Sequence, residues 1–256
     1  MTETQEQLLS LLSQALFNSP SSNILTDEIL TEARAQTVST LIAPKYGILA
    51  ANIRVINAHA KLTKLLGEIP FTTFKGYASA FYYPEPTMRP MGDVDFIVGS
   101  ESYQDVVKLL ESSGWKKSEL SHDRHEAFHK GGVEFELHSE IKGIPNGIDG
   151  IITKSTTAEK KVRSLLANLI PTARIVETQQ GKILIPDDFH HGLIMLLHVA
   201  GHMINDGGVG LRHLCDWAVY AEHVNLEQYK GELESVPSRF MRKIVCRLRL
   251  SEVSRQ

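Results

Sequence analysis

Two short segments of this chain place an acidic residue at every second position. Residues 93–98 read Asp-Val-Asp-Phe-Ile-Val, and residues 133–138 read Val-Glu-Phe-Glu-Leu-His. Successive side chains of a β-strand point to opposite faces of the sheet. Each segment is therefore predicted to be a strand that buries one apolar face and carries carboxylates on the other.

The acidic faces of these two strands are candidates for a metal site. Asp93 and Asp95 would lie side by side, and two close carboxylates repel each other unless a cation neutralises them. Oxygen ligands suit hard divalent ions such as Mg²⁺ or Mn²⁺. If the second strand lies beside the first, Glu136 adds a third carboxylate, with Glu134 as the competing choice on the same face. Such a platform suits two-metal phosphoryl or nucleotidyl transfer.

The rest of the chain divides by pattern into three parts. Residues 1–68 show apolar residues at helical spacing, residues 69–142 show short strand-like runs separated by glycines, and residues 143–256 are mainly helical. Gly131-Gly132 between two apolar runs predicts a hairpin, because glycines supply the positive φ of a tight turn. The pattern predicts an α+β protein, with a mixed α/β segment between N- and C-terminal helical parts.

A third candidate element precedes the acidic strands. Lys75-Gly76 stands between a predicted strand, residues 71–74, and a predicted helix. Glycine lets a backbone approach a phosphate closely, and a lysine adds positive charge. Arg89, held beside Pro90, is a further candidate for contact with a phosphate or a carboxylate.

Composition excludes several classes of protein. With 27 Lys+Arg against 30 Asp+Glu the net charge is −3, which argues against a surface that binds nucleic acid over its whole extent. No apolar run approaches the ~18 residues of a membrane span, and the first residues do not resemble a secretion signal, so we expect a cytoplasmic protein. Cys215 and Cys246 are predicted to be small buried residues, and residues 239–249 a basic amphipathic helix with a solvated face.

The helical part after residue 186 contains two pairs of polar residues spaced four apart. His198 and His202 share one helical face, but no acid stands between them as in H-E-x-x-H, so a zinc site is the less favoured interpretation. Arg212 and Asp216 share another face, and we interpret them as a structural ion pair that fixes this part against the core.

These motifs together resemble a known family. The quoted residues are Lys75-Gly76, Tyr82-Tyr83-Pro84, Arg89-Pro90-x-Gly92-Asp93-x-Asp95, Glu136-Leu137-His138, His198, His202, Gly210-Leu211-Arg212-His213 and Asp216. In this order they resemble the nucleotidyltransferase family found in many bacterial genomes, within the DNA polymerase β-like superfamily.

The resemblance implies a polymerase β-like core, which is a small mixed sheet with flanking helices, and a set of roles. Asp93, Asp95 and Glu136 would bind Mg²⁺ or Mn²⁺, and Glu136 would help to activate the acceptor hydroxyl. Gly76, with Lys75 and Arg89, would hold the triphosphate. The resemblance also raises the expectation that His202, Arg212 and Asp216 border the substrate pocket.

The leading functional prediction is a metal-dependent nucleotidyltransferase. It would transfer a nucleoside monophosphate from a nucleoside triphosphate to a small molecule, protein or nucleic acid, and release pyrophosphate. A first alternative is a glycosyltransferase, because D-x-D after a strand also binds the metal of a nucleotide sugar. A second is a nucleotide-binding module without turnover, kept open by Tyr77 where the superfamily usually has a small residue.

Overall fold

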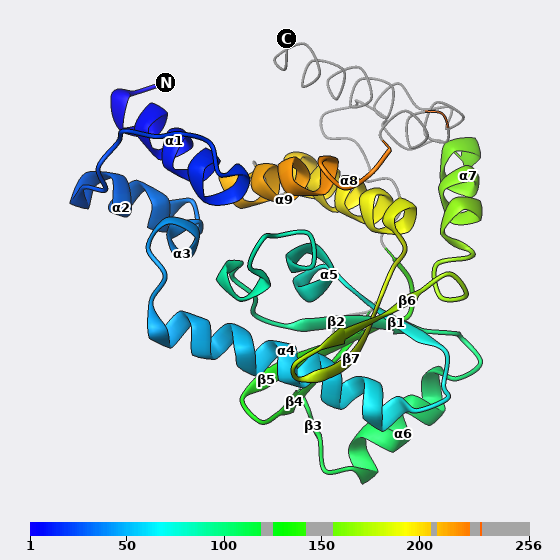
Figure 1. The fold of residues 1–256 in the computed structure, drawn as a ribbon. Coiled ribbons are helices and arrows are strands. Elements are labelled where there is room, and N and C mark those ends of the chain that lie inside the picture. The colour runs from blue at the N-terminus through cyan, green and yellow to red at the C-terminus, as the bar shows by residue number, and fades with distance from the viewer. Residues whose placement is uncertain (119–124, 142–155, 206–208, 226–230, 232–256) are drawn as a thin grey trace.

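A five-stranded mixed sheet organises the fold (Figure 1). The structure, a computed structural model, describes residues 1–118, 125–141, 156–205, 209–225 and 231. The strands lie in the order β1-β2-β5-β4-β3, where only β2 and β5 run parallel. Their bounds are β1 Phe71–Phe74, β2 Val94–Val98, β3 Lys116–Lys117, β4 His125–Lys130 and β5 Val133–His138. The α+β class expected from the sequence is confirmed.

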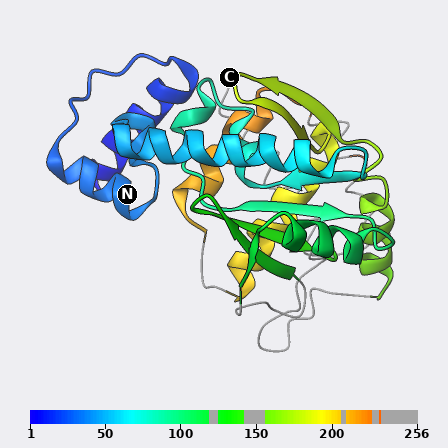
Figure 2. The same cartoon turned by 90° about the horizontal axis from the view of Figure 1, so that it is seen from below.

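Helices α4 (Tyr46–Leu66) and α6 (Tyr103–Ser112) cover one face of this sheet (Figure 2). The alternation in β2 and β5 explains this choice of face, because every second residue of these strands is apolar and points into the same core. That core also takes up Trp115 and side chains from both helices. The apolar side chains contributed by the two strands are Val94, Phe96, Val98, Val133, Phe135 and Leu137.

The opposite face carries the polar residues of β2 and β5 and is covered by C-terminal elements. These are α7 (Thr156–Leu166) and α8 (Asp188–Asn205), and α9 (Leu211–Ala221) packs against α8 and α5 (Gly76–Ala80). The hairpin of β6 (Arg174–Thr178) and β7 (Gly181–Ile185) packs instead against β1 and α4. Ile194 of α8 packs against Phe74 and Ile97 of the sheet. Two short helices, α5 and the 3₁₀ turn η1 (Pro86–Met88), lie in the connection between β1 and β2.

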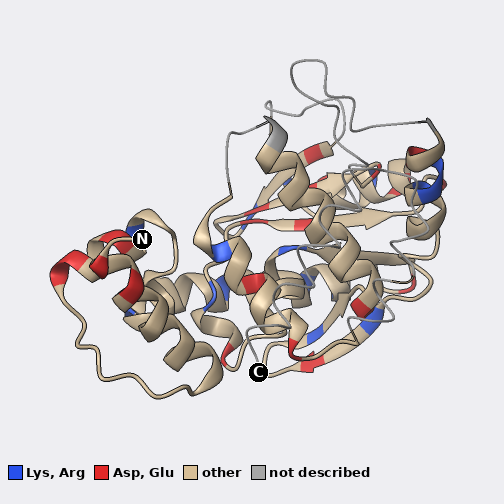
Figure 3. Cartoon of the chain, turned by 90° about the horizontal axis from the view of Figure 1, so that it is seen from above, with Lys and Arg blue, Asp and Glu red and all other residues tan. Residues whose placement is uncertain are grey.

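Three N-terminal helices pack beside the sheet, as Figures 1 and 2 both show in blue. They are α1 (Glu3–Phe17), α2 (Asp27–Ala35) and α3 (Ser39–Ile42), and their shared core includes Val219 and Tyr220 of α9. Acidic residues in the first turns of α1 and α2, drawn red in Figure 3, favour the positive ends of these helices. Thr2 also caps α1 through a capping box with Gln5.

The three strands predicted at residues 71–74, 93–98 and 133–138 are present within one residue of their expected ends. Gly131 and Gly132 have φ of 62° and 76°, as the hairpin between β4 and β5 requires. Cys215 is buried as expected, whereas Cys246 and the predicted helix at 239–249 lie outside the described residues. Among the helices that the structure describes, none is long and apolar enough to cross a membrane.

Candidate active site

Carboxylates from the parallel strands β2 and β5 meet on the face opposite α4 and α6. Asp95 is directly paired in register with Glu136, which confirms the expected adjacency of the two acidic strands. Asp95 is 1% exposed and Glu136 is partly buried. Asp93 stands one residue before β2 and is also partly buried. Glu134, the competing choice, is exposed and lies opposite His129 of β4.

One oxygen of Asp95 is neutralised from two sides. Lys75 Nζ lies 2.7 Å from Asp95 Oδ1, and His138 Nε2 lies 2.9 Å from the same oxygen. His138 Nε2 also lies 3.2 Å from Glu136 Oε2 and so joins the two acids. Asp95 Oδ2 is buried, and no hydrogen-bond partner for it exists among the described residues. This oxygen is therefore available to a ligand.

The pKa values of the cluster reflect competition between burial and charge. Burial alone raises the pKa of Asp95, but the hydrogen bond from His138 and the charge of Lys75 hold it below its usual range. The pKa of Asp93 is raised by burial and by repulsion from Asp95 and Glu136. Burial lowers the pKa of His138, and the bonds to Asp95 and Glu136 overcome this and raise it. The acids thus lie close enough to repel one another.

The turn between β1 and α5 brings backbone and positive charge to these acids. Lys75 has φ 57° and Gly76 has φ 31°. A positive φ at a lysine is strained, and strained backbone conformations are commonly found at functional sites. A Cβ added to Gly76 would stand 3.4 Å from the backbone oxygen of Asp93. The side chain of Tyr77 is buried with Ile56 and Ile183 and is not part of the cavity described below.

A buried ion pair joins the loop before β2 to helix α9. Arg89 donates to Asp216 through Nε at 2.7 Å and through Nη2 at 2.8 Å, and Tyr83 donates to the same carboxylate at 2.8 Å. Arg89 Nη1 also donates to the backbone oxygen of Gly76 at 3.1 Å. The structure pairs the Asp216 carboxylate directly with Arg89, 127 positions away, instead of with Arg212 as the spacing predicted. Burial raises the pKa of Asp216, but the charge of Arg89 and the nearby charge of Arg212 lower it below its usual value.

These elements enclose a cavity of about 250 Å³ between the sheet and the helices. Its sheet side and connecting loops contribute Lys75, Gly76, Arg89, Asp93 and Asp95, and its helical side contributes His198, His202, Arg212, His213 and Asp216. The three residues expected to border a pocket, His202, Arg212 and Asp216, thus line the same cavity as Asp93 and Asp95. Glu136, the third predicted metal ligand, is paired with Asp95 on the neighbouring strand and is not among the residues that line the cavity.

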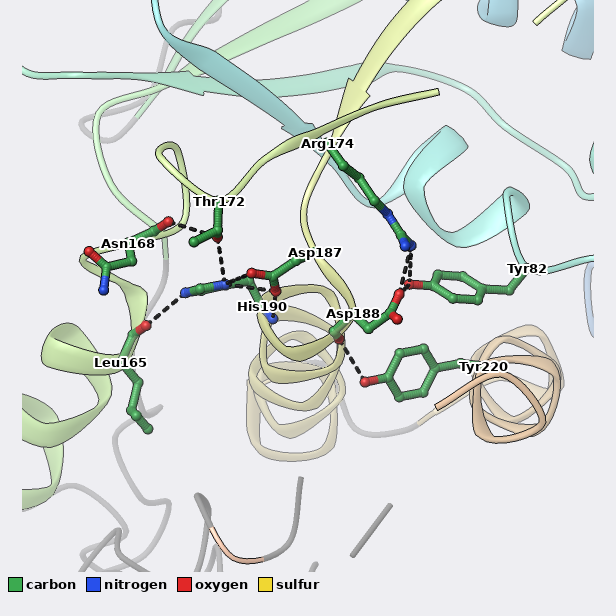
Figure 4. Close-up of polar contacts among 9 residues, drawn as sticks. All are labelled: Tyr82, Leu165, Asn168, Thr172, Arg174, Asp187, Asp188, His190 and Tyr220. Carbon is green, nitrogen blue, oxygen red and sulfur yellow. Dashed lines mark hydrogen bonds and ion pairs between the residues drawn. The ribbon is translucent and has the colours of Figure 1, made fainter. Parts of the chain in front are cut away.

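Polar contacts fix the start of α8 against its neighbours (Figure 4). Asp188 Oδ1 accepts from Tyr82 and from Arg174 of β6, each at 2.6 Å, and the backbone oxygen of Asp188 accepts from Tyr220 of α9 at 2.7 Å. His190 lies between Asp187 and the backbone oxygen of Leu165, with both ring nitrogens engaged. The helix that carries His198 and His202 therefore has a defined position over the sheet.

Sequence reasoning missed some residues of this site. His138 shares the acidic face of its strand with Glu136, and its position two residues after Glu136 is the signal that could have assigned it a role. His213 and Tyr83 are among the motif residues of the family resemblance, but the sequence predicts no role for them because no local spacing connects them to the acids.

Several solved structures show weak similarity to this chain. ANT(2″)-Ia in complex with adenylyl-2″-tobramycin is 12% identical, with a TM-score of 0.47, over 73% of this chain and 99% of that one. The lincosamide antibiotic adenylyltransferase LnuA with lincomycin bound is 13% identical, with a TM-score of 0.39, over 68% and 97%. An antigenic nucleotidyltransferase-like protein from Paracoccidioides brasiliensis is 14% identical, with a TM-score of 0.43, over 68% and 76%.

Family assignment rests on the sequence. Comparison with curated protein sequences found no significant match. The sequence model of a family described as uncharacterised nucleotidyltransferase matches residues 5–234, which include every described residue of the site. The resemblance noted in the motifs is thereby confirmed, and the chain belongs to this family of nucleotidyltransferases.

Proposed function

We propose that this enzyme transfers a nucleoside monophosphate from a nucleoside triphosphate to an acceptor, with release of pyrophosphate and with dependence on Mg²⁺ or Mn²⁺. The observation that carries the proposal is the in-register pair of Asp95 and Glu136, with Asp93 one residue before the same strand. This arrangement gathers three carboxylates beside a cavity that also contains Lys75 and Gly76.

The donor set fits a hard divalent cation. Asp93, Asp95 and Glu136 offer carboxylate oxygens, and the buried Asp95 Oδ2 has no hydrogen-bond partner in the part of the chain that is described. The raised pKa of Asp93, caused by burial and by its acidic neighbours, indicates that the cluster has too little positive charge of its own. When bound, such an ion would supply charge stabilisation to the transferring phosphoryl group.

The remaining residues position the donor. The Lys75 ammonium, in contact with Asp95 Oδ1, is the cation nearest to the acids and can bind a phosphate beside them. Gly76 leaves the backbone of the turn accessible for a close approach. Arg89 already uses its guanidinium on Asp216 and on the Gly76 carbonyl, so we assign it to holding this turn rather than to binding phosphate directly. Glu136, adjacent to His138, is the candidate for orienting the acceptor hydroxyl.

Among the alternatives, the observations favour turnover by a nucleotidyltransferase. Tyr77 raised the possibility of a binding module without activity, but its side chain packs into the core between α4 and β7. Family membership points to nucleotidyl transfer rather than to glycosyl transfer from a nucleotide sugar. The acceptor stays open, because neither the family description nor the cavity lining identifies it.

A thermal-shift screen tests the proposal. The protein is melted with ATP, GTP, CTP, UTP or nucleotide sugars, each with and without Mg²⁺ or Mn²⁺. A ligand at about one hundred times its Kd stabilises by ~2.7 kcal/mol, which corresponds to about 5–11 °C for a chain of this size. We expect a metal-dependent shift with at least one triphosphate, followed by transfer of its α-³²P label to an acceptor fraction.

Two variants of the same strands sharpen the screen. Asp95→Asn removes a carboxylate charge at nearly constant shape and should abolish both the metal-dependent shift and the transfer. Glu134→Gln removes an exposed carboxylate from β5 and should leave both intact. A shift with nucleotide sugars alone would favour glycosyl transfer, and transfer that survives in Asp95→Asn would refute the site.

A further inference from the structure

Three histidines meet on the helical wall of the cavity. His198 and His202 lie one turn apart on α8, and His213 reaches them from α9. One ring nitrogen from each residue lies within 4.8 Å of the other two. His198 Nε2 and His202 Nε2 are 3.1 Å apart, and all three side chains line the cavity. The nucleotidyl transfer proposed above assigns no role to this cluster.

The spacing of the nitrogens matches a shared ion. Two imidazole nitrogens at the Zn–N distance of about 2.0–2.1 Å on a tetrahedral centre lie about 3.4 Å from each other. The His198–His202 separation is already close to this value. His213 is partly exposed on α9, so rotation of its side chain can bring the third nitrogen inward.

The chemistry of the cluster favours a transition metal over Mg²⁺. Imidazole nitrogens suit zinc, copper and nickel, whereas Mg²⁺ prefers oxygen. Imidazole binds such ions in its neutral form.

We propose that His198, His202 and His213 form a binding site for a borderline divalent ion of the Zn²⁺ type, distinct from the carboxylate site on the sheet. Three histidine ligands leave one tetrahedral position open, as in catalytic rather than closed structural zinc sites. Because the three residues line the cavity, this position is accessible to an oxygen or anionic group of a molecule bound there. The site links α8 to α9 and goes beyond the proposed nucleotidyl transfer.

Isothermal titration calorimetry tests the site. The protein is freed of metal with EDTA, the EDTA is removed, and Zn²⁺ is titrated in. We expect His198→Ala and His213→Ala each to weaken Zn²⁺ binding at this site by more than ~100-fold, since loss of an outer-shell partner alone costs 10–100-fold. His129→Ala, which removes an exposed histidine of β4, is the matched control and should bind as the wild type. Melting curves in EDTA verify that each variant is folded.

The carboxylate cluster must be separated from this site, because Asp95, Glu136 and His138 also present ligand atoms close together. In Asp95→Asn we expect one equivalent of Zn²⁺ to bind and to require His198. X-ray absorption at the zinc edge should then show three imidazoles at about 2.0–2.1 Å, a readout that needs no substitution in the histidines. Absence of tight zinc binding, binding unaffected by both histidine variants, or an oxygen-dominated shell would overturn the proposal.

Discussion

The buried pair of Arg89 and Asp216 supports a quantitative prediction about stability. Their side chains are 7% and 8% exposed, and both hydrogen bonds of the bidentate contact are 2.8 Å or shorter. Asp216→Ala would leave the Arg89 guanidinium buried without its carboxylate. Breaking a buried pair by removing one partner costs about 3–5 kcal/mol. At about 2–4 °C per kcal/mol for a chain of this size, Tm should fall by roughly 6–20 °C.

Urea unfolding of three variants distinguishes this loss from other causes. The double variant Arg89→Met/Asp216→Leu removes both charges and should recover much of the stability, because a well-packed apolar pair of similar volume commonly replaces a buried ion pair without loss. Lys108→Ala breaks an exposed pair with Asp105, whose side chains are 75% and 77% exposed, and should cost less than about 1 kcal/mol. If Asp216→Ala costs no more than Lys108→Ala, the pair is solvated and the reasoning fails.

Two further predictions concern the turn and the buried histidines. Gly76→Ala adds a Cβ to a residue with φ 31° and should lower the free energy of unfolding, measured in urea, by about 1 kcal/mol or more. The same variant should weaken nucleotide binding. Gly47→Ala, in open space on α4, should not lower the free energy of unfolding. Burial lowers the pKa of His191 to about 3, while the unfolded chain titrates near 6.5, so stability is lost as pH falls below this value. Between pH 6.5 and about 5 the loss is about 2 kcal/mol, and His191→Phe should abolish that share; an unchanged pH dependence would contradict it.

The local elements could be predicted because their signals are local. The alternation in β2 and β5 shows which side chains share a face, and the glycines at 131 and 132 indicate the hairpin. The parallel register that sets Asp95 beside Glu136 needs more, since it depends on α6 crossing over the sheet between the two strands. The order of motifs, interpreted through the family resemblance, supplied this information.

The helical wall could not be predicted in the same way. Spacing of four residues placed Arg212 and Asp216 on one face of α9, and an ion pair between them was the natural local interpretation. In the structure that face packs onto the loop before β2, where the buried Arg89 donates two hydrogen bonds to the Asp216 carboxylate. A partner 127 positions away leaves no trace in local periodicity.

The two groups of ligands around the cavity differ in a way that bears on how the enzyme would sort metals. The group on the sheet side consists mainly of carboxylate oxygens, and the group on the helical side consists of three imidazoles. Ligand type selects between hard and borderline ions, so we expect Mg²⁺ and Zn²⁺ to prefer different groups. His138 weakens this separation, because it adds a nitrogen beside Asp95 and Glu136. Excess Zn²⁺ is therefore expected to displace Mg²⁺ at the carboxylate site through His138 and so to inhibit nucleotidyl transfer. His138→Asn should reduce this inhibition by Zn²⁺ without affecting the zinc bound by the three histidines.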